Sequence, residues 1–207
     1  MSDFKDFRDN GYILKRKLFS EDEISKLTEF IERNSEKENQ ARETFSSTGK
    51  LNITLWNEPS NDLFGKFSTN ERIVKPMAEF LEDEVYHYHS KVIWKKPGDG
   101  GFDWHQDYGY WYHYGCLRPM MASAMIAVDP TKLSNGCLEV LKGSHHLCRL
   151  DHSLAGEQSG SDPERVKVAV EQYEKVAVEL EPGDTLFFIA ICSTVQVKTI
   201  LLSLAGQ

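Results

Sequence analysis

The sequence is poor in cysteine. Its 207 residues include four, Cys116, Cys137, Cys148 and Cys192, and no two of them have Cys-x-x-Cys spacing. Four such cysteines are too few for the disulfide framework of a small secreted domain. We therefore expect buried, reduced thiols.

Positive charge and long apolar runs are also scarce. A total of 24 Lys and Arg against 32 Asp and Glu gives a formal net charge of -8, which excludes a general affinity for nucleic acid or anionic membranes. No apolar run reaches the roughly 18 residues of a membrane span, and Met1 to Lys5 does not begin a secretory signal. We expect a cytoplasmic protein with a small-molecule substrate and no nucleic-acid or membrane partner. The sequence leaves the oligomeric state open.

What the sequence does contain is the composition of an ordinary globular protein. Its hydrophobic fraction is 40% and its charged fraction is 27%, which argues against disorder. The length suits one domain with a sizeable core. Within it we expect a mainly helical part over residues 1–83, a β-rich core over 84–188 and an atypical tail over 189–207.

The N-terminal part carries clear helix signals. Ser20 and Glu23 have the spacing of a capping box, and apolar residues recur behind them at helical spacing through Ile31. This pattern predicts a helix near residues 20–34. We also expect helices near 3–9, 71–82 and 162–174, short strands near 11–14 and 51–57, and a loop over 35–50.

From Glu84 onward the sequence is typical of β structure. Short runs rich in aromatic and β-branched residues are separated by turn signals, the strongest of which is Glu181-Pro182-Gly183-Asp184. The expected strands are 85–95, 102–106, 120–128, 136–141, 176–180 and 185–188. Short strands at such spacing favour an antiparallel sandwich or barrel.

The run Trp104-His105-Gln106-Asp107 carries the most specific chemistry. On an extended strand, residues i and i+2 point to the same side, so His105 and Asp107 are predicted to hold one metal ion together. They make up two-thirds of the two-His-one-carboxylate set that binds non-haem Fe(II).

Several pieces of the sequence together resemble the phytanoyl-CoA dioxygenase-like family of Fe(II)/2-oxoglutarate-dependent oxygenases. The resemblance covers about residues 85–188, and each piece is weak alone, but their order and spacing are specific. The pieces are Lys95-Lys96-Pro97-Gly98, Trp104-His105-Gln106-Asp107, Asn135-Gly136-Cys137-Leu138, Gly143-Ser144-His145 and Glu181-Pro182-Gly183-Asp184-Thr185-Leu186-Phe187-Phe188.

This resemblance implies a fold and a set of cofactors. The fold would be mainly β with flanking α, a double-stranded β-helix (jelly roll) whose C-terminal strands we expect to be incomplete here. Fe(II) would be the metal, with 2-oxoglutarate and O2 as co-substrates, and His105 and Asp107 would be the first two iron ligands. The Asn135 to Leu138 turn and the Gly143 to His145 loop would lie near the substrate entrance.

A dense aromatic patch follows the predicted ligands directly, from Tyr108 to Tyr114. Half of it has the character of ordinary core, and the remaining rings are expected to line the substrate pocket. The candidate pocket residues are Trp104, Gln106, Tyr108, Tyr110, Trp111 and His145.

Other histidines have simpler interpretations. His87 and His89 also stand two residues apart, but their strand neighbours, Tyr86, Tyr88, Val92 and Trp94, look like the buried face, so both imidazoles are expected to face outward. The group His145, His146, Cys148 and His152 matches no common zinc module. We expect it to form an exposed entrance loop.

The third iron ligand is missing. The family places a histidine six residues beyond the Phe-Phe pair and an arginine roughly ten residues later, which binds the far carboxylate of 2-oxoglutarate. After Phe188 this sequence has neither residue type through Gln207; Thr194 stands at the histidine position, and Lys198 has the wrong spacing to replace the arginine. Restoring one nucleotide after the Phe188 codon permits the reading His-Ser-Asn-Leu-Leu-His-Ser-Ser-Gly-Gln-Asn, with a histidine at position 194.

Three functional hypotheses follow. The first is an Fe(II)/2-oxoglutarate-dependent dioxygenase that hydroxylates a small organic substrate and is impaired in this chain, because two protein ligands hold iron poorly. The loss of closing strands would also leave an unpaired edge near Phe187 and Phe188. The second hypothesis is a non-catalytic ligand-binding or regulatory module on the same scaffold. The third is a zinc protein that uses the loop from His145 to His152.

Overall fold

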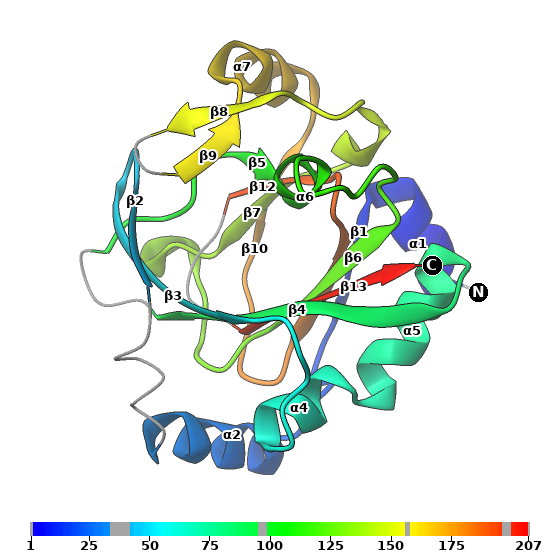
Figure 1. The fold of residues 1–207 in the computed structure, drawn as a ribbon, viewed down its shortest axis with the longest axis vertical. Coiled ribbons are helices and arrows are strands. Elements are labelled where there is room, and N and C mark those ends of the chain that lie inside the picture. Colours follow the sequence, from blue (N-terminus) through cyan, green and yellow to red (C-terminus); the bar gives the residue numbers. More distant parts are fainter. Residues whose placement is uncertain (1, 34–41, 95–98, 156–157, 196–199, 207) are drawn as a thin grey trace.

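The computed structural model describes residues 2–33, 42–94, 99–155, 158–195 and 200–206. Its framework is two antiparallel sheets (Figure 1). The larger sheet contains, in spatial order, β1 (Tyr12–Lys15), β11 (Thr185–Ile189), β6 (Met121–Ile126), β13 (Ile200–Gly206), β4 (Val85–Trp94), β3 (Gly49–Trp56) and β2 (Arg42–Ser46). The smaller sheet contains β10 (Lys175–Val178), β7 (Leu138–Leu141), β12 (Ser193–Val195) and β5 (His105–Gln106).

The remaining elements surround these sheets. A separate hairpin pairs β8 (His152–Ala155) with β9 (Gln158–Ser161). The α-helices are α1 (Ser2–Asn10), α2 (Glu21–Arg33), α4 (Leu63–Ser68), α5 (Glu71–Leu81), α6 (Asp107–Tyr112) and α7 (Pro163–Gln172), and two short 3-10 helices are η1 (Leu133–Asn135) and η2 (Ser144–His146). The predicted fold, mainly β with flanking α, is confirmed. In the described part of the chain, every helix is too short or too polar to cross a lipid bilayer.

Helix α2 begins where the capping box predicts. The Ser20 backbone N–H donates to Glu23 Oε2 at 2.9 Å, and the Glu23 backbone N–H donates to Ser20 Oγ at 3.3 Å. These two bonds satisfy backbone donors that the first helical turn leaves without partners.

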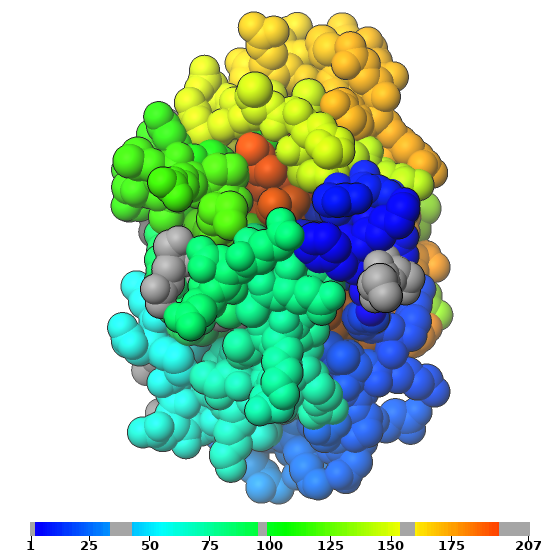
Figure 2. Space-filling model, turned by 90° about the vertical axis from the view of Figure 1, so that its right-hand side faces the viewer, coloured from blue at the N-terminus to red at the C-terminus, as the bar shows by residue number. Residues whose placement is uncertain are grey.

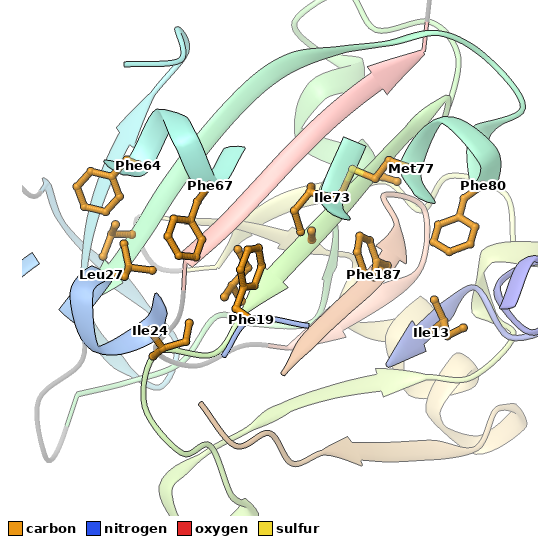
Figure 3. Packing of buried hydrophobic residues seen from close by; sticks show 14 of the residues in the cluster. Ile13, Phe19, Ile24, Leu27, Phe64, Phe67, Ile73, Met77, Phe80 and Phe187 are labelled. Atoms are coloured by element: carbon orange, nitrogen blue, oxygen red, sulfur yellow. The ribbon is translucent and has the colours of Figure 1, made fainter. Parts of the chain in front are cut away.

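The main core lies between the N-terminal helices and the larger sheet. Figure 3 shows Phe64, Phe67, Ile73, Met77 and Phe80 pointing from α4 and α5 toward the strands. Full burial of each such side chain contributes about 1.5–3 kcal/mol. In Figure 2, α1 and α5 cover this side of the molecule. The helices thus cover one face of the larger sheet, and the candidate site lies on its other face.

The C-terminal strands correct one expectation. β12 pairs with β5 and β7, while β13 lies between β4 and β6. Consequently β11 is flanked by β1 and β6: Phe187 pairs with Ile13 on one side and with Ala124 on the other. The predicted unpaired edge at Phe187 and Phe188 is wrong, because β1 and β6 pair with the two sides of β11. Residues beyond Phe188 also form strands, β12 and β13, although their sequence departs from the family pattern.

A second correction concerns the loop expected over residues 35–50. Residues 34–41 lie outside the described residues, but β2 and the start of β3 form a hairpin across the rest of this span. The inward residues Thr44 and Ser46 are buried hydroxyls, so the strand carries no apolar alternation to reveal it. Lys95 to Gly98, one piece of the family resemblance, also lies outside the described residues.

Candidate metal centre

His105 and Asp107 meet in the interior. His105 Nε2 lies 3.4 Å from Asp107 Oδ1, and the two side chains are 1% and 6% exposed. The predicted geometry is wrong in one detail: β5 ends at Gln106, and Asp107 is the first residue of α6. The side chains converge across this strand-to-helix junction rather than along one strand. Figure 1 shows α6 close to β5 and β12.

Neighbouring groups orient both side chains. His105 Nδ1 is 2.7 Å from the Asp103 carbonyl oxygen, so Nδ1 carries the donated proton in the neutral ring. This leaves the lone pair on Nε2, the nitrogen that faces Asp107. Ser123 Oγ donates to Asp107 Oδ2 at 3.1 Å. One carboxylate oxygen is thereby held, while the other faces the imidazole.

The charge of Asp107 is stabilised in place. Burial alone would raise the pKa of this carboxyl group, but the nearby positive charge of Lys91 is the largest of the effects that bring the pKa below its ordinary value. Asp107 is therefore ionised at neutral pH, which is the form that binds a metal ion.

The third ligand position is occupied by a poor donor. Thr194 on β12 is the cross-strand partner of His105 and is 2% exposed. Within the described ranges, no group of three or more His, Cys, Asp or Glu side chains is placed to hold one metal ion. His105 and Asp107 are therefore two candidate ligands, and the described residues do not fit a complete facial triad.

Two of the predicted pocket rings border the site. The Tyr110 ring lies 5.3 Å from the His105 ring and 4.9 Å from that of His152. The Trp111 ring lies 4.6 Å from the His89 ring. Trp104 is half-buried, and its carbonyl oxygen accepts a hydrogen bond from the Ser161 backbone at 2.8 Å.

The structure does not place the other three candidate pocket residues beside His105 and Asp107. Gln106, between the two ligands in sequence, points away from them, and its amide bonds the backbone at Ile191 (2.9 Å) and Leu150 (2.7 Å). The Tyr108 hydroxyl donates to the Leu117 carbonyl at 2.8 Å. His145 Nε2 lies 2.8 Å from the Arg8 carbonyl, against α1. Their contacts hold loops in place.

The expectation that His89 faces outward is wrong. Its side chain is buried, at 1% exposure, while Tyr86 on the supposed buried face is 48% exposed. His87 is half-buried and bonds the Asn57 carbonyl and Ser90 Oγ. The error has a physical cause: both faces of β4 are covered from His89 onward, so the strand shows no alternation between apolar and polar residues.

The zinc hypothesis receives no support from the described residues. His152 Nε2 lies near Ser161 Oγ (3.2 Å) and the Gln106 backbone N–H (3.3 Å). His145 turns toward α1, and Cys148 is exposed. These side chains diverge and do not surround a common point.

Sequence reasoning missed two residues near the pair. Ser123 on β6 holds the Asp107 carboxylate, and Lys91 on β4 lies in the same interior. A lysine directly before the apolar run from Val92 to Trp94 was the available signal for the second. Lys198, the replacement considered for the missing arginine, lies outside the described residues.

Comparison with known proteins identifies the family. The family model described as phytanoyl-CoA dioxygenase (PhyH) matches residues 7–191. The chain belongs to this family. The proteins of known structure that it resembles include oxygenases crystallised with Fe or 2-oxoglutarate, so these are the metal and co-substrate of its relatives.

The relatives of this phytanoyl-CoA dioxygenase family member are distant. The peroxisomal phytanoyl-CoA dioxygenase of Rattus norvegicus is 23% identical over 206 residues, which cover 89% of this chain and 59% of the relative. The ectoine dioxygenase of Bordetella bronchiseptica is 24% identical over 197 residues, covering 86% and 64%. The chain thus spans about three-fifths of the length of these relatives.

The structural neighbours show the same fold. EctD from S. alaskensis with bound Fe has a TM-score of 0.80 and 19% sequence identity, over 98% of this chain and 75% of that one. The epimerase SnoN in complex with Fe3+ and alpha ketoglutarate has a TM-score of 0.77 and 14% identity, over 99% and 82%. At these identities the comparison confirms the predicted jelly roll.

Proposed function

We propose that this chain is a single-domain Fe(II)/2-oxoglutarate-dependent dioxygenase scaffold for a small organic substrate, with a weakened metal site. The reaction of an intact site would convert a C–H bond, O2 and 2-oxoglutarate into the alcohol, succinate and carbon dioxide. The observation that carries this proposal is the approach of His105 Nε2 and Asp107 Oδ1 to 3.4 Å in the buried interior. Family membership supplies the reaction class.

The weakening follows from the third position. Thr194 offers a neutral hydroxyl where the family pattern has an imidazole, and imidazole is a far better ligand for Fe(II). With two protein donors, iron is held less tightly and its open positions are less well fixed. We therefore expect low turnover from the chain as it stands.

A non-catalytic ligand-binding role is the second candidate. The same observation favours it: Thr194 is buried and paired opposite His105, so the fold is kept without the third donor. Such a protein would bind a small acid in the barrel and release no succinate.

Calorimetry and a turnover assay test these roles. Mn(II), a stable substitute for Fe(II), should bind weakly to the unaltered chain and not at all to His105→Ala or Asp107→Ala. Succinate release with Fe(II), 2-oxoglutarate and a panel of small substrates should be low. Mn(II) binding by the two alanine variants as strong as that of the unaltered chain would refute the assigned ligands. Tight metal binding with rapid succinate release would refute the weakening. Ligand binding with no release at all selects the second candidate.

A further inference from the structure

Lys91 is an unusual residue of the barrel interior. It is the one lysine or arginine that is buried in the described part of the chain, at 8% exposure. Its ammonium group lies over the Phe102 ring, 5.1 Å from the centroid. This aromatic face and the negative charge of Asp107 each compensate the buried cation in part, while burial lowers the pKa of the ammonium group.

His89 lies beside Lys91 on the same side of β4. The two residues are i and i+2 on one strand, so their side chains share a face. His89 is 1% exposed, and neither ring nitrogen has a hydrogen-bond partner. A buried polar group without a partner requires an explanation in any folded protein. His89 is such a group, and its neighbour Lys91 is a buried cation.

Both side chains face the candidate metal centre. The Phe102 ring that contacts Lys91 lies 5.5 Å from the His105 ring. The positive charge of Lys91 acts on Asp107, and it is the first of the charges that lower the pKa of that carboxyl group. Val92, which alternates with these residues, packs on the opposite face beneath the helices.

An exposed apolar residue lies next to Lys91 in the sheet. Leu55 on β3 is its direct cross-strand partner, and directly opposed residues project from the same face of a sheet. Leu55 is nevertheless 48% exposed. Lys91 is therefore buried directly beside a residue of the same sheet face that reaches the protein surface.

We propose that Lys91 and His89 form a carboxylate-binding subsite inside the barrel. The Lys91 ammonium would supply the charge and a His89 N–H would supply a hydrogen bond, so that a bound carboxylate satisfies both groups. Two carboxylates fit this chemistry: the far carboxylate of 2-oxoglutarate, or a carboxylate carried by the substrate.

The position of β13 relates this subsite to the missing arginine, a step that rests on the proposed function. The position about ten residues beyond Thr194 is Leu204 on β13, whose register partner on β4 is His87, while Lys91 pairs with Leu201 of the same strand. The family pattern has its arginine on the strand that corresponds to β13, and Lys91 is a cation on the neighbouring strand β4. This places the compensating charge on a neighbouring strand instead of at Lys198.

Calorimetry with matched acids tests the subsite. The probes are 2-oxoglutarate, glutarate, which lacks the keto group, and 2-oxopentanoate, which lacks the far carboxylate. We expect Lys91→Met to weaken the binding of 2-oxoglutarate and of glutarate at least tenfold and to leave 2-oxopentanoate binding unchanged. Lys91→Arg should retain most of the affinity for 2-oxoglutarate and glutarate. Lys175→Met, which removes an exposed lysine of β10, is the control and should bind like the unaltered chain. His89→Phe should show a smaller loss than Lys91→Met.

Other outcomes show which molecule supplies the carboxylate, and they distinguish failure of the subsite from failure of the proposed metal site. If Lys91→Met leaves 2-oxoglutarate affinity unchanged but weakens hexanoate binding, the subsite receives the carboxylate of a substrate. A His105→Ala, Asp107→Ala double variant that still binds glutarate through Lys91 would keep the subsite even if the metal proposal fails. Lys91→Gln replaces Lys91→Met if circular dichroism shows that the latter is unfolded. Equal binding of all acids by the Lys91 variants and the unaltered chain, or no binding of any acid, overturns the subsite.

Discussion

Thr194 and His105 stand directly opposite each other on the antiparallel strands β12 and β5. Cross-strand partners have Cβ atoms about 4.5–5.5 Å apart, so a side chain at position 194 lies beside the imidazole that we assign to the metal. The fold therefore keeps the place of the third ligand although the residue there is a poor donor. Under the proposed function, the weakening would therefore come from the side chain at position 194 and not from the strand arrangement.

Replacing Thr194 with histidine should complete the set of donors. We expect Thr194→His to tighten Mn(II) binding at least tenfold, about 1.4 kcal/mol or more, as measured by calorimetry. The control is Ser193→His, because Ser193 pairs with Gln106, whose side chain points away from the metal ligands. Equal tightening by both variants, or by neither, would contradict the assignment of position 194.

Ser123 should stabilise the protein through Asp107. Its hydroxyl donates to a buried carboxylate at 3.1 Å, and hydrogen bonds to charged groups contribute about 1.5–3 kcal/mol. We expect Ser123→Ala to lower the free energy of unfolding in urea by about 1.5 kcal/mol. Thr185→Val is the matched control, since the buried Thr185 Oγ1 has no hydrogen-bond partner. Removing the Thr185 hydroxyl should leave the free energy of unfolding unchanged or raise it. A larger loss of stability for Thr185→Val than for Ser123→Ala would refute this account.

Features set by short-range contacts could be predicted from the sequence. The capping box of Ser20 and Glu23 places the start of α2, because the two residues bond each other's backbone. His105 and Asp107 were recognised as a pair because they are two residues apart and lie within a specific motif. Neither prediction needs knowledge of distant strands.

Features set by distant segments could not be predicted. Whether His89 faces water depends on what covers each face of β4, and that is decided by the N-terminal helices on one side and by Trp111 on the other. The burial of Lys91 has the same origin. The short helix α6 was also missed, since its aromatic residues gave no helical periodicity.

The tight turn before β11 should depend on Gly183. This residue has φ +89°, in the left-handed region, and a Cβ there would overlap the Phe19 carbonyl. We expect Gly183→Ala to cost at least about 2–3 kcal/mol in the free energy of unfolding, from backbone strain plus the clash. Gly115→Ala serves as the control: its φ is +99°, but nothing lies within 4 Å of the added Cβ. It should cost only about 1 kcal/mol, and similar losses at both sites would show that the clash is relieved without cost.

Glu23 should make stability depend on pH in the acid range. The hydrogen bond from Arg72, followed by that from the Ser20 backbone, lowers the pKa of Glu23 from 4.5 to about 2. Because the pKa is lower in the folded state, this contribution is present above pH 4.5 and is lost as the pH falls toward 2. The carboxylate is over one-third exposed, so solvent screening limits the expected gain to about 1 kcal/mol. Glu23→Gln should therefore be less stable than the unaltered chain at pH 6 and equal to it near pH 2, in urea titrations at both values. The control is Glu71→Gln, which removes an exposed ion pair with Lys75. It should have nearly the same difference in stability between pH 6 and pH 2 as the unaltered chain. An unaltered pH dependence in Glu23→Gln would assign the acid sensitivity to other carboxylates.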